Sequence, residues 1–99
     1  MNTELTREKL LLAAQRALLG VVTPPLRAVD AFWMESSIKI NFVYDSGFSR
    51  NACESELRSE FETQLIADFP GFKIVVSVEE LGMQERIQPQ GELVYLRAN

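Results

Sequence analysis

The hydrophobic positions of the chain predict two amphipathic helices. In residues 4–19, apolar side chains recur at helical spacing up to Gly20. In residues 51–69, four large apolar side chains recur four residues apart, at Leu57, Phe61, Leu65 and Phe69. Such spacing places an apolar stripe on one side of a helix, and glycine or proline directly after the stripe favours a helix end. Because Pro70 follows the second stripe, we predict helices over 4–19 and 51–69.

Side chains that can accept hydrogen bonds from backbone amides stand at both predicted helix starts. Asn2 or Thr3 precedes the first helix, and Asn51 stands at the start of the second. Glu54 follows Asn51 by three residues, which is the spacing of a capping box. We therefore expect Asn51 and Glu54 to exchange hydrogen bonds with each other's backbone.

Four other segments have the period of two that is typical of strands. Residues 37–44 and 72–79 alternate cleanly, residues 92–97 follow Gly91, and residues 26–34 show a blurred alternation. Only Glu35 and Ser36 separate the first two strands, so we expect a hairpin there. Residues 81–90 show no clear period and are predicted to form a loop.

The predicted order of elements is helix, strand, strand, helix, strand, strand. Each helix has one apolar stripe and each strand one apolar face, and these surfaces must be buried against one another. We therefore predict an α+β fold in which two helices pack on one face of a four-stranded, mainly antiparallel sheet. A chain of 99 residues is enough for one such domain, over residues 1–99.

Phe32 and Trp33 are adjacent in a predicted strand, so they should point to opposite faces of the sheet. One is expected to enter the core. The other is expected on the open face, near a group of valines: Val29, Val43, Val75 and Val94. Two interpretations stay open, a face with scattered apolar residues or a contact surface for a homodimer or a partner protein.

The composition argues against catalysis and against bound metals or cofactors. The chain has no histidine, which removes the most common general base and metal ligand, and it has a single cysteine, Cys53. We expect Cys53 to pack as a small apolar residue against the core. The glycines are isolated, so no phosphate-binding loop is present. We predict no enzyme activity, no metal site and no cofactor.

The overall charge and hydropathy indicate a cytoplasmic protein that binds neither nucleic acid nor membrane. The formal charge is -4, whereas phosphate binding requires clustered lysine and arginine. The first twenty residues mix charges with leucines, unlike a signal peptide. No apolar run approaches the roughly 20 residues of a membrane-spanning helix.

The negative charge lies in the second half of the chain, because charges cancel over residues 1–48. One group of carboxylates belongs to the predicted second helix: Glu54, Glu56, Glu60, Glu62 and Asp68. A second group begins at the end of the third predicted strand: Glu79, Glu80 and Glu85. Either group is a solvated surface or an acidic patch that meets a basic partner. A glycosidase-like pair at Glu56 and Glu60 is disfavoured, because no desolvating pocket is evident.

Four short segments in this order and spacing resemble a family of small bacterial proteins: Ala17-Leu18-Leu19-Gly20, Pro25-Leu26-Arg27-Ala28-Val29, Leu65-Ile66-Ala67-Asp68-Phe69 and Val94-Tyr95-Leu96-Arg97. The chain is similar to immunity proteins of polymorphic toxin systems, of the Maf and contact-dependent-inhibition kind. The resemblance implies a cognate toxin as partner, and it assigns no catalytic residue.

The resemblance and the charge pattern together predict an immunity protein that occludes its toxin stoichiometrically. Many such toxins are nucleases with basic clefts, so an acidic inhibitor surface is the complement they require. The alternative is a homodimeric structural or protein-interaction domain that has no toxin partner and associates through its open sheet face.

Overall fold

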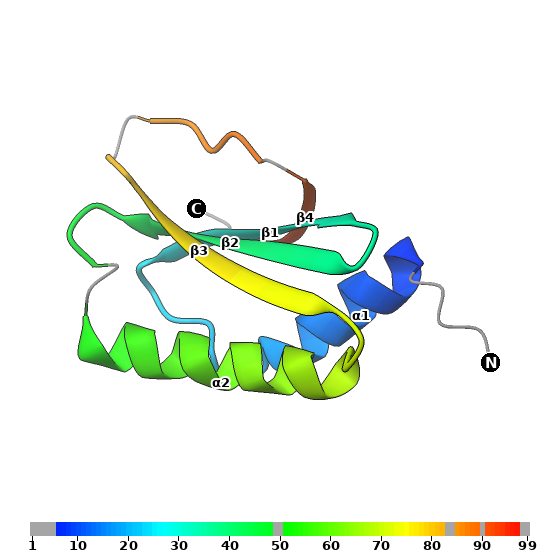
Figure 1. The fold of residues 1–99 in the computed structure, drawn as a ribbon. Coiled ribbons are helices and arrows are strands. Elements are labelled where there is room, and N and C mark those ends of the chain that lie inside the picture. The colour runs from blue at the N-terminus through cyan, green and yellow to red at the C-terminus, as the bar shows by residue number, and fades with distance from the viewer. Residues whose placement is uncertain (1–5, 49–50, 83–84, 90, 98–99) are drawn as a thin grey trace.

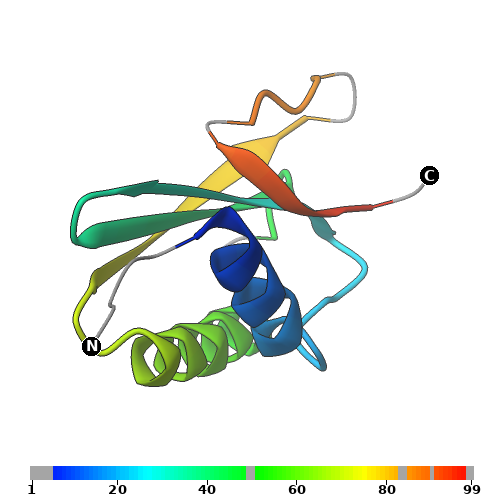
Figure 2. The same cartoon turned by 90° about the vertical axis from the view of Figure 1, so that its right-hand side faces the viewer.

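The computed structural model describes residues 6–48, 51–82, 85–89 and 91–97. Its elements in chain order are α1 (Arg7–Ala17), β1 (Leu26–Met34), β2 (Ser37–Asp45), α2 (Ala52–Asp68), β3 (Lys73–Leu81) and β4 (Glu92–Leu96). Both helices lie on the same side of the sheet (Figures 1 and 2). The predicted α+β class and element order are therefore confirmed.

The four strands form one mixed sheet with the spatial order β3-β2-β1-β4. Strand β1 pairs antiparallel with both β2 and β4, whereas β2 and β3 are parallel. Adjacent parallel strands need a long crossover connection, and α2 provides it. The sheet is therefore mainly antiparallel, as predicted, with one parallel pair created by the position of α2 in the sequence.

The hairpin between β1 and β2 forms where it was predicted. Met34 pairs with Ser37, which leaves Glu35 and Ser36 as the turn. Glu35 has a φ of 50°, in the left-handed region that tight hairpin turns commonly require.

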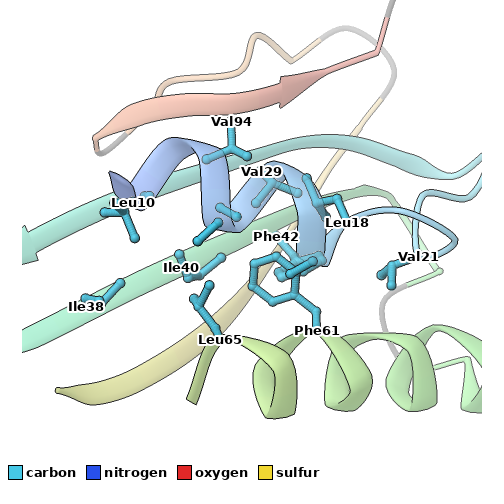
Figure 3. Packing of buried hydrophobic residues seen from close by; sticks show 14 of the residues in the cluster. Leu10, Leu18, Val21, Val29, Ile38, Ile40, Phe42, Phe61, Leu65 and Val94 are labelled. Atoms are coloured by element: carbon cyan, nitrogen blue, oxygen red, sulfur yellow. The ribbon is translucent and has the colours of Figure 1, made fainter. Parts of the chain in front are cut away.

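The core lies between the helices and the face of the sheet that they cover. Four alternate side chains of β2 are buried there: Ile38, Ile40, Phe42 and Tyr44. Phe61 and Leu65 of α2 are fully buried against this layer (Figure 3). The Phe61 ring meets that of Phe42 edge to face, with centroids 5.1 Å apart. The predicted stripe of α2 is thus confirmed, with Leu57 and Phe69 partly buried toward its two ends.

A bulge explains the blurred alternation of β1. The register against β2 shifts between Leu26 and Ala28, and the register against β4 shifts between Val29 and Asp30. A one-residue insertion moves every later side chain to the opposite face. Val29, which follows the shift in β1, joins the helix-side core. Val94 is the extra residue of β4 between Leu93 and Tyr95 and joins the same core, so the predicted place of both valines on the open face is wrong (Figure 3).

Phe32 and Trp33 of β1 point to opposite faces of the sheet, as predicted. Trp33 packs against the helix-side core, and Phe32 is 43% exposed on the other face. Val75, from β3, is also exposed, whereas Val43 is buried in a small cluster on the open face. Both of these valines therefore lie on the predicted face.

The two helix starts differ from the predicted ones in instructive ways. Helix α1 begins at Arg7, where the Thr6 hydroxyl accepts a hydrogen bond from the Lys9 amide at 3.1 Å. The expected caps Asn2 and Thr3 lie outside the described residues. Asn51 does cap α2, since its side-chain oxygen accepts from the Cys53 amide at 2.8 Å.

The reciprocal half of the capping box at α2 is not formed. The Asn51 amide donates to the carbonyl of Phe48, at 3.3 Å, and the Glu54 carboxylate accepts from Thr23 instead. The predicted capping box is therefore wrong in both halves: the Asn51 side chain accepts from the Cys53 amide instead of the Glu54 amide, and a tertiary partner, Thr23, replaces the Asn51 amide at Glu54.

Candidate functional site

The outer side of α2 carries the exposed part of the predicted acidic patch. Glu56 and Glu60 are exposed one turn apart, and Glu62 is half-buried. Their exposure follows from helical geometry, because they lie away from the stripe that packs on the sheet. Asp68, in the last turn, is exposed and accepts a hydrogen bond from the side-chain amide of Gln64 at 3.4 Å. Glu56 and Glu60 therefore form the negatively charged surface on the outer side of α2. Glu62, two residues after Glu60, lies on another side of the helix, and Asp68, three residues after Leu65, lies on the side of the buried stripe, near its end.

Glu54 does not belong to this exposed surface, although it was predicted there. Glu54 is only 6% exposed, and its Oε1 accepts a hydrogen bond from the Thr23 hydroxyl at 2.7 Å. The contact joins the first turn of α2 to the segment that leads into β1. A carboxylate is also favoured at a helix N-terminus, where the backbone amides point toward it. Glu54 is thus a buried structural contact.

The single basic residue of α2, Arg58, is directed toward the sheet. Its Nη1 donates to the Tyr44 hydroxyl at 3.2 Å, and its guanidinium carbon lies 5.4 Å from the centroid of that ring. Burial raises the pKa of the Tyr44 phenol, and the hydrogen bond from Arg58 partly opposes this shift. These two contacts with Tyr44 join the middle of α2 to β2.

The second predicted acidic group is divided between the two faces of the sheet. Glu79 and Glu80 are consecutive in β3, so they point to opposite faces. Glu79 accepts from the Asn41 side-chain amide at 3.1 Å, whereas Glu80 accepts from the Gly47 amide at 3.1 Å. The three carboxylates of this group therefore do not form one patch.

A shallow hollow on the open face brings Glu79 and Glu85 together. It has a volume of about 470 Å³ and is lined by Glu79, Leu81, Glu85, Arg86 and Gln88. The Glu85 carboxylate already has a local hydrogen bond, since its Oε1 accepts from the Gly82 amide at 2.6 Å. Arg86 contributes a positive charge to the same hollow, so the region is less acidic than the surface of α2.

The described residues contain no cluster of metal-ligating side chains. No group of three Cys, Asp or Glu side chains could hold a metal ion in the described ranges. Cys53 is exposed, so the expectation that it packs against the core is wrong. It lies in the first turn of α2, on a side of the helix that the Phe61 and Leu65 stripe does not share.

A comparison with models of known protein families assigns this chain to a family. The model of the MafI2 immunity protein family matches residues 7–99. The chain belongs to the MafI2 immunity protein family. A search of curated proteins finds no match. The family match covers every element of the fold, from α1 to β4.

In this MafI2 family protein, segments that suggested the resemblance meet at one end of the sheet. Arg97, which follows β4, donates two hydrogen bonds to Asp45 at the end of β2, at 2.9 and 3.1 Å. Arg27 in β1 approaches the same carboxylate at 3.8 Å and donates to the carbonyls of Gly82 and Glu85. Arg27 and Arg97 therefore hold the end of the sheet and the segment after β3.

Sequence reasoning did not identify Asp45 as the centre of this contact. The residue stands where a strand ends, and this position alone suggests only a turn. Its partner Arg97 lies 52 residues further along the chain, so no local pattern connects the two.

Among the described helices, none is long and apolar enough to cross a membrane.

Proposed function

We propose that this MafI2 family protein, acting as one domain in the cytoplasm, neutralises a cognate bacterial toxin by binding it stoichiometrically and without catalysis. The observation that carries the proposal is the family match over residues 7–99. The charge and geometry of α2 support a binding mechanism, because its exposed carboxylates can attract and orient a basic partner.

We assign the toxin contact to the outer surface of α2. Glu56 and Glu60 supply the charge there, and Glu62 and Asp68 are further candidate contacts on other sides of the helix. The complementary partner has a basic surface, as a nuclease does at the cleft that binds phosphates. Occlusion of that cleft would stop the toxin without any reactive group on the immunity protein.

The hollow at Glu79 and Glu85 is the weaker candidate for the same contact. Both carboxylates already accept hydrogen bonds within the chain, and Arg86 lies beside them. A partner that used this hollow would have to compete with these contacts. The two surfaces can be separated by mutation, because α2 and the hollow share no residue.

The proposal is tested with a candidate toxin, for which a reading frame next to the gene of this protein is the first choice. Calorimetry with the purified toxin should show a complex of equal stoichiometry, and co-expression should restore growth. The variant Glu56→Lys/Glu60→Lys should weaken binding by roughly tenfold or more at low ionic strength, and the difference should shrink with added salt. Its fold should persist, since both side chains are exposed.

Glu8→Lys is the matched control for a single reversal such as Glu56→Lys. Glu8 is also an exposed helical glutamate, but it belongs to α1. Its reversal changes the net charge equally and should leave the affinity nearly unchanged. Equal effects of the two reversals would remove α2 from the mechanism, and growth protection without a complex would contradict neutralisation by binding.

A further inference from the structure

The outer edge of β3 is long and regular. Strand β3 is the terminal strand of the sheet and spans nine residues, Lys73–Leu81. It pairs with β2 from Lys73 to Leu81 without a register shift. Strand β4, at the opposite edge, has five residues and an irregular register against β1. Short or bulged edges resist further pairing, whereas a long regular edge is a template for another strand.

The hydrogen-bond pattern shows which residues of β3 face this edge. The Lys73 amide donates to the Ser36 carbonyl at 2.8 Å, and the Leu81 carbonyl accepts from the Ser46 amide at 3.0 Å. Odd-numbered residues of β3 therefore bond to β2. Backbone groups alternate in direction along a strand, so the even-numbered residues Ile74, Val76 and Val78 turn their N–H and C=O groups outward.

The side chains of β3 are arranged symmetrically about Val76. Lys73 and Glu79 are each three residues from it, with opposite charges and on the same, open face of the sheet. Ile74 and Val78 are each two residues from it on the helix side, where Val78 is 40% exposed. An antiparallel strand related by a two-fold axis at Val76 would therefore meet complementary side chains on both faces.

We propose that β3 pairs antiparallel with β3 of a second copy of this chain, forming a homodimer with one continuous sheet. In this register Ile74 faces Val78 of the second copy, and their outward backbone groups exchange hydrogen bonds. Lys73 faces Glu79 of the second copy at a position without backbone bonds, where side chains lie closer together. The two-fold axis repeats each of these contacts.

Neighbouring registers do not match in the same way. A shift by one residue would oppose outward backbone groups with groups already bonded to β2. A shift by two residues places Lys73 opposite Ser77 or Leu81, so the charge pairs are lost. Backbone phase thus excludes the odd shifts, and side-chain charge selects this register among those that remain.

The test measures the dissociation constant of the dimer by sedimentation equilibrium on the full chain. Lys73→Glu should raise this constant by about tenfold or more, because two attractive pairs become repulsive. Glu79→Lys alone should do the same, and the double variant should restore association with the pairs inverted. Lys39→Glu, an exposed residue of β2 on the same face, changes the net charge as Lys73→Glu does and should have little effect.

Val76→Pro provides a second variant that does not depend on charge. Its amide points outward, so proline removes no bond between β3 and β2 but eliminates the central bonds of the dimer. A monomer of native circular dichroism is the expected result. This variant and Lys73→Glu decide the question even if Glu79→Lys disturbs the hydrogen bond from Asn41.

Three outcomes would overturn the dimer. These are a monomer at every concentration up to about 1 mM, a dimer unaffected by Lys73→Glu and Val76→Pro, and a double variant of native circular dichroism that does not associate. A monomer in which Lys73→Glu and Glu79→Lys alter toxin affinity would instead assign the edge to a strand of the toxin. The proposed immunity function is measured separately, since its deciding residues lie on α2.

Discussion

At the scale of single residues, Gly91 is required by a close approach between backbones. A β-carbon at this position would lie 2.2 Å from the Ala31 carbonyl oxygen, a rigid part of β1. Gly91→Ala should therefore lower the free energy of unfolding by about 1–3 kcal/mol, the range found for overpacked sites. Gly71→Ala, where nothing lies within 4 Å, should have little effect in the same urea titration. Equal stabilities of the two variants would contradict this packing.

Glu54 illustrates how one hydrogen bond separates a structural carboxylate from a surface one. Removal of its buried bond to Thr23 by Glu54→Ala should cost about 1.5–3 kcal/mol of unfolding free energy. Glu56→Ala, at an exposed site of the same helix, should stay within about 0.5 kcal/mol. Urea unfolding of both variants checks the difference, and a neutral Glu54→Ala would show that the bond contributes little.

At the scale of elements, the end of β2 is joined to β4 by a contact that depends on pH. The hydrogen bonds from Arg97 hold the pKa of Asp45 below its ordinary value, although partial burial opposes this shift. A depressed folded-state pKa means that the ionised carboxylate stabilises the fold. This contribution is fully present above the unfolded pKa of about 3.9, and it is lost as the pH falls through the folded value.

The comparison with Asp45→Asn measures this contribution. The variant should be less stable than the natural protein at pH 7, and the two urea midpoints should converge as the pH falls below about 4. The side chain is partly exposed, so solvent screening keeps the difference modest. A difference that stayed constant between pH 7 and pH 2 would exclude the ionised pair as its cause.

Helices and strands were predictable here to the extent that their periods were regular. The stripe from Leu57 to Phe69 and the alternation of β2 are local patterns, and both were confirmed. The bulge after Leu26 was not predictable, because it depends on pairing with Tyr44 and Val43 in another strand. That bulge decided on which face Val29 lies.

At the scale of the whole molecule, an acidic helix surface was predictable, but which carboxylates reach solvent was not. The excess of carboxylates over 54–62 indicated an acidic helix, and the structure leaves Glu56 and Glu60 exposed there. Glu54 was grouped with them, and Glu80 was grouped with Glu79, by proximity in sequence. The fold directs the first into a buried contact and the second to the side of the sheet away from Glu79.

The element order, the fold class and the resemblance to an immunity family follow from local patterns alone, because each depends on hydrophobic period or on short motifs. The tertiary structure alone decided which strands are neighbours, which carboxylates reach solvent and which edge stays open. These properties depend on contacts between residues far apart in the chain, such as Thr23 with Glu54 and Asp45 with Arg97. The hydrophobic pattern of the sequence indicates which side of each segment can be buried. Only tertiary packing determines the partner against which that side is buried.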